Sequence, residues 1–146
     1  MKTLLTLFVL FFSSSVVASE LSDCKKINDN VKRPACYESL FEKLTTSKDD
    51  QKKRKKYIKE LSKKDKIFKK IEKSGDYLKV WIKCNFFKLV RREQQAFIEL
   101  IDSYYNLDNN YKYIFIMDSK HPNTAMQPGG YKPQTGKLTL NYNRCY

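Results

Sequence analysis

The stretch YKYIFIM at residues 111–117 decides the fold class, because its β-branched and aromatic residues predict a β-strand. Before it, residues 91–105 place apolar side chains at a period of 3.6 residues, which predicts an amphipathic helix. Residues 77–86 alternate between apolar and polar side chains, as a strand with one buried face does. Residues 137–142 (KLTLNY) predict a shorter strand. The chain from 77 to 146 is therefore predicted to form a β-α-β-β core.

A helical reading of residues 77–86 stays open, because Trp81, Cys84 and Lys88 would then share one helical stripe. With the strand reading, the natural arrangement places the helices on one face of a small, mostly antiparallel sheet. The predicted fold class is α+β, with an N-terminal helical hairpin and a basic helix packed on this sheet.

The sequence pattern over residues 20–75 predicts helices. Residues 20–46 read as a helical hairpin, with a break at residues 28–30 and Pro34 near the start of its second helix. Apolar side chains recur on both sides of that break, so each helix has a face to bury.

Residues 47–75 form a second, strongly basic segment that also reads as helical. Ser47 and Asp50 fit a capping box, so a helix is predicted to start there, and Gly75 marks its expected end. A second capping box at residues 62–65 leaves open whether this segment is one helix or two short helices.

The first nineteen residues predict export. A basic start is followed by the apolar run LLTLFVLFF at residues 4–12 and then by small residues, which is typical of a secretory signal peptide over residues 1–19. Residues 20–146 are then one exported domain, periplasmic or extracellular. No later stretch has the length of a membrane span, so we expect no transmembrane segment in the mature chain.

Four cysteines, Cys24, Cys36, Cys84 and Cys145, predict two disulfides in an exported chain. Four cysteines allow three pairings, and the spacing alone does not choose among them. A Cys84–Cys145 bridge would tie the first strand of the core to the end of the chain, which would otherwise fray.

The cysteines at 24 and 36 also carry a resemblance. CKKI at residues 24–27 and RPACYESLF at residues 33–41 resemble a motif of small exported Gram-negative proteins, including VasI-type proteins associated with type VI secretion. Those proteins tend to begin Cys-x11-Cys-Tyr followed by an acidic residue, with Arg-Leu-Ala before the second cysteine. This chain departs at Pro34, which replaces Leu, and at Glu38, which replaces Asp. The resemblance implies a periplasmic setting and a Cys24–Cys36 disulfide, and it implies no activity.

A formal net charge of +13 favours an anionic partner, although a lysine-rich composition alone is the alternative explanation. Seven lysines follow one another at alternating spacings of four and three, so a helix would place them on one face. Such like-charge neighbours destabilise a helix, and a bound polyanion would offset that effect. The predicted anion-binding residues are Lys52, Lys56, Lys59, Lys63, Lys66, Lys70 and Lys73.

The partner expected for these lysines is an anionic envelope component or an acidic protein. Nucleic acid is less favoured, because no recognised nucleic-acid motif accompanies the lysines. A solvated helix face that binds nothing is the competing interpretation.

Residues 118–136 hold most of the prolines and glycines and read as one long loop. Loops of this length in compact domains are often functional. Lys120, His121, Tyr131 and Lys132 are therefore predicted to form a second contact surface, with a flexible hairpin tip as the alternative.

Enzymatic function is not favoured. His121 with Asp118 or Glu93 would serve as the acid–base pair of a small secreted hydrolase or nuclease-type toxin. As the only histidine, His121 excludes paired-histidine chemistry and a histidine-rich metal site. Nothing in the sequence predicts a cofactor. The sequence therefore favours a non-enzymatic basic binding protein, and an accessory or inhibitor protein of a secretion or envelope system is a further alternative.

Overall fold

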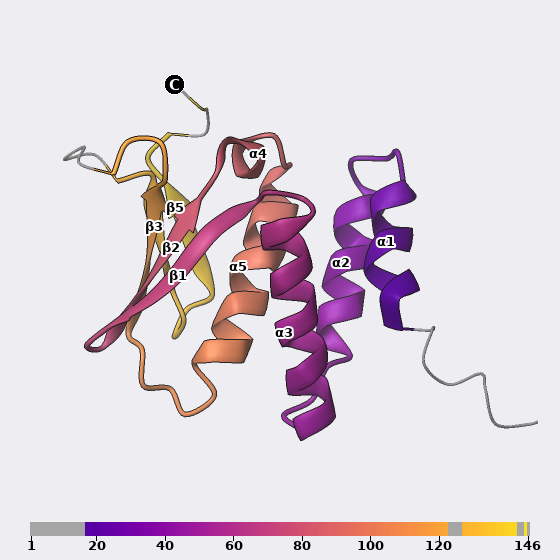
Figure 1. Ribbon diagram of the computed structural model, residues 1–146, viewed down its shortest axis with the longest axis horizontal. Helices are drawn as coiled ribbons and strands as arrows, with labels where there is room; N and C mark the ends of the chain where they lie inside the picture. The colour runs from indigo at the N-terminus through magenta and orange to yellow at the C-terminus, as the bar shows by residue number, and fades with distance from the viewer. Residues whose placement is uncertain (1–16, 123–126, 143–144, 146) are drawn as a thin grey trace, which may run out of the picture.

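The computed structural model describes residues 17–122, 127–142 and 145 (Figure 1). Its helices and strands confirm the predicted α+β class. In chain order they are α1 (Val17–Lys26), α2 (Lys32–Glu42), α3 (Lys48–Lys63), β1 (Phe68–Ser74), β2 (Tyr77–Ile82), α4 (Cys84–Phe87), α5 (Arg91–Tyr105), β3 (Tyr113–Asp118), β4 (Gly129–Lys132) and β5 (Lys137–Leu140). The predicted signal segment lies outside the described residues except for its last three, which begin α1.

The five strands form one sheet in the order β1-β2-β3-β4-β5. Neighbouring strands are antiparallel except β2 and β3, which run parallel with Leu78 opposite Ile114 and Val80 opposite Ile116. The connection between these two strands is long enough to contain α4 and α5, as a parallel pair requires. The sheet is therefore mostly antiparallel, as predicted.

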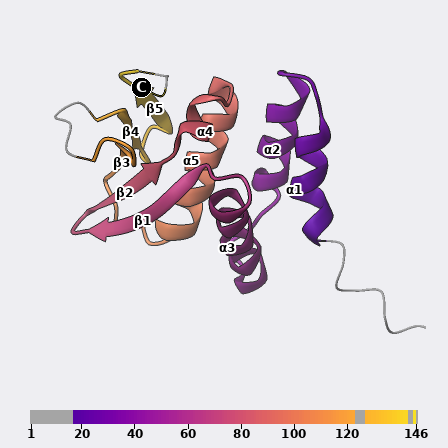
Figure 2. The same cartoon turned by 45° about the horizontal axis from the view of Figure 1, so that its top comes forward.

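The helices are layered on one side of the sheet. Helix α5 lies next to the strands, α3 lies beside it, and α2 and α1 lie farthest from the sheet (Figures 1 and 2). The helix side of β2 is fully buried at Leu78, Val80 and Ile82. Helix α5 buries Ile98 and Ile101 in the same core, because its apolar residues recur on one stripe. This burial of apolar area on both elements fixes α5 against the sheet.

The N-terminal hairpin forms as predicted. A disulfide joins Cys24 on α1 to Cys36 on α2, with 5.5 Å between their Cα atoms. The side chain of Asp29 in the turn accepts hydrogen bonds from the backbone N–H groups of Val31 and Lys32 at 2.8 and 2.7 Å. These bonds satisfy donors at the start of α2, which otherwise lack helical partners.

The second disulfide joins Cys84 and Cys145, with 5.2 Å between their Cα atoms. The sequence placed Cys84 on a strand, but β2 ends at Ile82 and Cys84 begins the short helix α4. The disulfide nevertheless ties Cys145, near the end of the chain, to the rest of the fold, as predicted for a Cys84–Cys145 bridge.

The prediction of a helical segment over residues 47–75 is wrong in its second half. Helix α3 ends at Lys63, Lys66 takes a positive φ of 54°, and the chain continues as β1. Ser62 caps no second helix, because its hydroxyl donates to the carbonyl of Phe68 at 3.1 Å. Gly75 does not end a helix but takes a φ of 58° in the turn between β1 and β2.

The prediction of one long loop over residues 118–136 is also wrong, since β4 lies inside it. The two glycines of β4 explain why this segment can form a strand and why the sequence did not predict one. A Cβ atom at Gly129 would overlap the backbone of Thr139 on β5, and one at Gly130 would overlap the phenol of Tyr113 on β3. Glycine is depleted in strands generally, but here it allows neighbouring groups to approach closely.

Candidate anion-binding site

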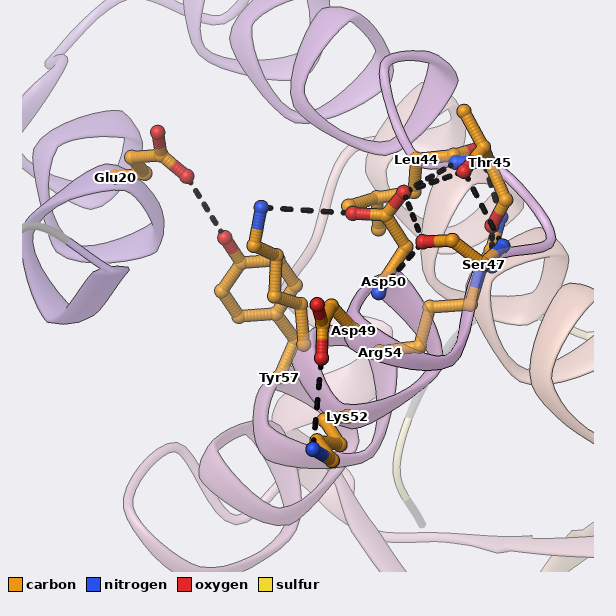
Figure 3. A network of polar contacts seen from close by, with 10 residues as sticks. Glu20, Leu44, Thr45, Ser47, Asp49, Asp50, Lys52, Arg54 and Tyr57 are labelled. Carbon is orange, nitrogen blue, oxygen red and sulfur yellow. Dashed lines mark hydrogen bonds and ion pairs between the residues drawn. The ribbon is translucent and has the colours of Figure 1, made fainter.

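Helix α3 carries the lysines of the candidate site, and its start is fixed by a network of side chains (Figure 3). The hydroxyl of Ser47 accepts a hydrogen bond from the N–H of Asp50 at 3.2 Å, which confirms the predicted start of the helix. The Asp50 carboxylate accepts bonds from the hydroxyl and N–H of Thr45 at 2.6 and 3.0 Å. Hydrogen bonds from Thr45 and Ser47 lower the pKa of Asp50.

The side of α3 that faces the N-terminal hairpin is held by buried polar contacts. Arg54 donates to the carbonyl oxygens of Leu44 and Thr45 (Figure 3). The hydroxyl of Tyr57, which is fully buried, lies 3.0 Å from the carboxylate of Glu20 on α1. Burial, together with that carboxylate, raises the pKa of Tyr57, so its hydroxyl stays protonated as a donor.

A groove of about 260 Å³ opens between α3, β1 and the end of α5, and we call it the lysine groove. Its floor is apolar and consists of Ile58, Phe68 and Ile71, two of which are buried. Two tyrosines at the end of α5 form a wall. The lining residues are Lys55, Ile58, Lys59, Ser62, Lys63, Phe68, Lys70, Ile71, Tyr104 and Tyr105.

The charge of the groove is unbalanced. Within the part of the chain that the structure describes, Lys55, Lys59 and Lys63 form no ion pair within 4.0 Å. The carboxylate of Glu60, on the same helix, instead lies 3.0 Å from the ammonium of Lys25 on α1. Three exposed cations around an apolar hollow therefore create a positive potential that attracts a ligand with an anionic group.

The lysines predicted to form a stripe end up on three different elements. Lys52, Lys56, Lys59 and Lys63 lie on α3, Lys66 lies in the turn after it, and Lys70 and Lys73 lie on β1.

Three of these seven lysines, Lys59, Lys63 and Lys70, are nevertheless brought together in the lysine groove. The ammonium of Lys73 lies 5.7 Å from the ring centroid of Tyr105, which is part of the groove wall. Lys52 instead pairs with Asp49 at 3.4 Å, away from the groove.

Sequence reasoning missed Lys55, Tyr104 and Tyr105 as lining residues of the groove. A local signal for Lys55 was present, because Lys55, Lys59 and Lys63 are spaced by four and share one helix face. Nothing local linked the two tyrosines to these lysines, because the contact depends on how α5 packs against α3.

Only some of the residues predicted to form the second contact surface are exposed. Lys120 and Lys132 are exposed, but Tyr131 is 4% exposed and packs in the core of the sheet. Its register position opposite Ile114 and Leu138 explains this burial, since both are core residues. The prediction of Tyr131 as a contact residue is therefore wrong.

Of the two acidic partners predicted for His121, the structure brings Asp118 to it, whereas Glu93 pairs with Arg33 on α2. Nδ1 of His121 lies 3.1 Å from a carboxylate oxygen of the buried Asp118 at the end of β3. Burial raises the pKa of Asp118, but hydrogen bonds from Lys120 N–H and from His121 outweigh that effect and lower it overall. Asp118 is therefore held as a carboxylate that orients the imidazole.

Two further properties bear on the site. Among the described residues, no cluster of three histidine, cysteine, aspartate or glutamate side chains could hold a metal ion. None of the described helices combines the length and apolar character needed to cross a membrane.

Comparison with known proteins identifies no relative: no protein-family model, no curated protein and no solved structure matches the chain.

Proposed function

We propose that this protein is an exported, non-enzymatic binding protein that holds an anionic amphiphile of the cell envelope in the lysine groove. The observation that carries the proposal is a set of three lysines, Lys55, Lys59 and Lys63, which surround an apolar hollow and have no ion pair among the described residues. A lysine on a helix usually lies over apolar surface with its ammonium in water, so these three place charge at the mouth of the groove.

The floor of the groove supports an amphiphile rather than a purely ionic ligand. Contact with a polyanion needs only exposed charges, whereas a hollow over Ile58, Phe68 and Ile71 offers apolar surface to an acyl or aromatic group. Tyr104 and Tyr105 add two rings, packed edge to face with 4.8 Å between their centroids. The ligand would bury its apolar part on the floor and keep its anionic group among the lysines.

The disulfides support export, because such bonds persist mainly outside the cytoplasm. Residues of α1 after the predicted cleavage point anchor this helix: Glu20, Leu21, Cys24 and Lys25 all pack on or bond to the rest of the fold. The Cys24–Cys36 bond is the one that the resemblance to VasI-type proteins implies. An association with type VI secretion, which the same resemblance suggests, is part of the proposed function.

Binding of the oxidised chain to vesicles tests this function. Vesicles of phosphatidylglycerol in phosphatidylcholine should bind, and pure phosphatidylcholine should not. Replacing Lys59 and Lys63 with Gln should weaken binding by about tenfold to thirtyfold, because each lysine near an anionic surface contributes about 1 kcal/mol. Lys43→Gln with Lys88→Gln is the matched control, since both residues are exposed and lie outside the groove.

A general charge effect would weaken binding equally in both double variants, and that outcome would refute the groove as the site. The role of the floor has its own test. Octyl phosphate should compete with the vesicles at concentrations at which inorganic phosphate does not. Equal competition by the two phosphates would show that the apolar floor has no part in binding.

A second candidate function rests on the Asp118–His121 pair, which has the geometry of an oriented general base. It makes the protein a small secreted hydrolase or nuclease. Purified protein should then turn over a substrate, and His121→Ala should abolish the turnover. Activity that survives in His121→Ala would exclude this pair as the acid–base machinery.

A further inference from the structure

The sheet has a second face, which the described helices do not cover. All of them lie on the other side or at the end of the strands (Figures 1 and 2). The strand register places Tyr77 opposite Tyr113 and Trp81 opposite Met117, and all four alternate with buried core residues. We call this side, with its aromatic residues Tyr77, Trp81, Tyr113 and Phe115, the open face.

Three of these rings, those of Tyr77, Phe115 and Tyr113, form a continuous aromatic surface across the neighbouring strands β2 and β3. The centroid of Phe115 lies 5.1 Å from that of Tyr77 and 4.6 Å from that of Tyr113. Tyr113 extends over Gly130 of β4, in the space that any side chain at position 130 would fill. Its phenol therefore lies along the sheet and presents ring surface outward, with Gly130 buried beneath it.

The charges on the open face are almost all positive. Lys132 and Lys137 lie opposite each other on β4 and β5, on the same side as Phe115. The ammonium groups of Lys70 and Lys79 lie 4.9 and 5.7 Å from the ring centroids of Trp81 and Tyr77. Each of these two rings thus has a cation next to it.

The acidic residue of the open face, Glu72, is already engaged. Its carboxylate accepts a bond from the indole N–H of Trp81 and pairs with Lys70 at 2.7 Å. It therefore fixes the Trp81 ring and subtracts little from the charge that a ligand meets at Lys79, Lys132 and Lys137.

We propose that the open face binds single-stranded nucleic acid, with bases stacked on its aromatic rings and phosphates paired with its lysines. A nucleotide offers a flat ring and an adjacent anionic group, which complements the ring-and-ammonium pairs at Trp81 and Tyr77. Such cation–π contacts are weak at exposed sites, so a base can displace the ammonium while its phosphate keeps the charge paired. Duplex DNA fits poorly, because its bases are stacked on one another.

An acidic glycan is the closest competitor, but apart from the phenols of Tyr77 and Tyr113 the open face offers few groups that accept hydrogen bonds from sugar hydroxyls. Besides its lysines and rings, the strands contribute the engaged Glu72, together with Ser74 and Thr139. This site shares Lys70 with the lysine groove, but its aromatic rings and its other lysines lie outside the groove. It goes beyond the proposed function, and the test of the rings is independent of the groove lysines.

Trp81 is the only tryptophan of the chain and lies on the open face, so its fluorescence reports binding there. Oligothymidylate of about twelve nucleotides should quench this fluorescence, and an abasic oligomer of the same length should bind at least about tenfold more weakly. The protein is unchanged in this comparison, so folding does not affect it. Equal affinity for the abasic oligomer would overturn the proposal, as would equal quenching by duplex DNA or by a polyuronate.

Variants locate the site. Tyr113→Leu should weaken oligothymidylate binding by about tenfold, and Tyr113→Phe should keep it, because the ring and not the hydroxyl stacks on the base. Tyr142→Leu is the matched control, because Tyr142 stacks on Phe87 of α4, away from the rings of the open face. Circular dichroism and thermal unfolding identify any variant that fails to fold. Equal loss in folded Tyr113→Leu and Tyr142→Leu proteins would reject the open face as the site.

Discussion

The lysine groove and the open face share strand β1 but use lysine in opposite ways. In the groove, Lys59 and Lys63 have no acidic partner among the described residues and stand around an apolar hollow. Lys70 lines the groove as well, but its ammonium pairs with Glu72 and lies over the ring of Trp81 on the open face. The side chains of β1 alternate between the two sides, so one short strand supports both surfaces.

The two surfaces therefore differ in whether their lysine charges stabilise or destabilise the folded protein. An ammonium paired with a carboxylate and a ring contributes to stability, if only modestly at an exposed position. Ammonium groups spaced by four on a helix repel one another and reduce stability. A ligand of the kind proposed for the groove would offset this repulsion, and the five predictions below test this contrast.

The largest expected effect concerns the disulfide of the N-terminal hairpin, which contacts the groove helix α3. Replacing Cys24 and Cys36 with Ser should lower the free energy of unfolding by about 3 kcal/mol, as expected for so short a closed loop. Because α1 contacts α3 through Glu20 and Lys25, binding to phosphatidylglycerol vesicles should weaken as well.

Urea unfolding measures the first quantity and vesicle titration the second. The native fluorescence of Trp81 serves as the control, since the N-terminal hairpin lies on the other side of the sheet (Figure 1). A shifted Trp81 spectrum in the folded variant would show that the two surfaces are not independent.

The next effect concerns the open face. Gly130→Ala should destabilise the protein by about 2 kcal/mol, because the new methyl group must displace the phenol of Tyr113. Gly75→Ala is the control: its φ of 58° disfavours Ala, but no atom lies within 4 Å of the added Cβ, so about 1 kcal/mol is expected. A smaller loss for Gly130→Ala than for Gly75→Ala would contradict the position of Tyr113.

A smaller loss is expected from Lys70→Gln, which removes the pair with Glu72 and the contact with Trp81. Both partners are partly exposed, so we expect at most about 1 kcal/mol of destabilisation. Chemical unfolding at low and high salt measures it, and the ionic part should shrink as salt rises.

The opposite sign is expected for Lys59→Gln. Lys59 has a like charge four residues away on each side, at Lys55 and Lys63, and each such pair costs about 0.2–0.5 kcal/mol. The variant should therefore be more stable than the native protein by a few tenths of a kcal/mol, and the gain should vanish at high salt. A loss of stability would show that Lys59 serves the fold after all.

The smallest effect is spectral and depends on pH. Hydrogen bonds from Lys70 and then from Trp81 lower the pKa of Glu72 below its ordinary value of 4.5. A lowered pKa means that its stabilising contribution is present above the unfolded value and is lost as pH falls through the folded value. Trp81 fluorescence should therefore change below pH 4.5, and Glu72→Gln should abolish that transition while the protein stays folded.

Local patterns predicted the elements whose ends are fixed by nearby residues. The start of α3 was predicted because Ser47 and Asp50 cap it within one turn. Helix α5 was predicted because its apolar stripe is sufficient by itself to define a buried face. The turn of the N-terminal hairpin was predicted because Asp29 and its neighbours break the helix locally.

The elements that depend on distant partners were not predictable in the same way. Strand β1 continues a lysine-rich sequence and becomes a strand because Ile71 lies opposite Val80 of β2. Strand β4 is glycine-rich, and its glycines are explained only by the close approach of Tyr113 and Thr139, which are distant in the sequence. The spacing that selected Lys70 assumed a helix, and the residue reaches the groove because the chain turns back after α3.

The Cys84–Cys145 disulfide has a consequence for how the folded protein responds to proteolysis. The bond closes a covalent ring that contains α5, β3, β4 and β5. A protease that cuts the chain once between β3 and β4 would therefore release no fragment, and the nicked protein would keep its mass apart from one added water. Only reduction would separate the two pieces, so electrophoresis with and without a reductant would reveal a form that survives attack as a single molecule.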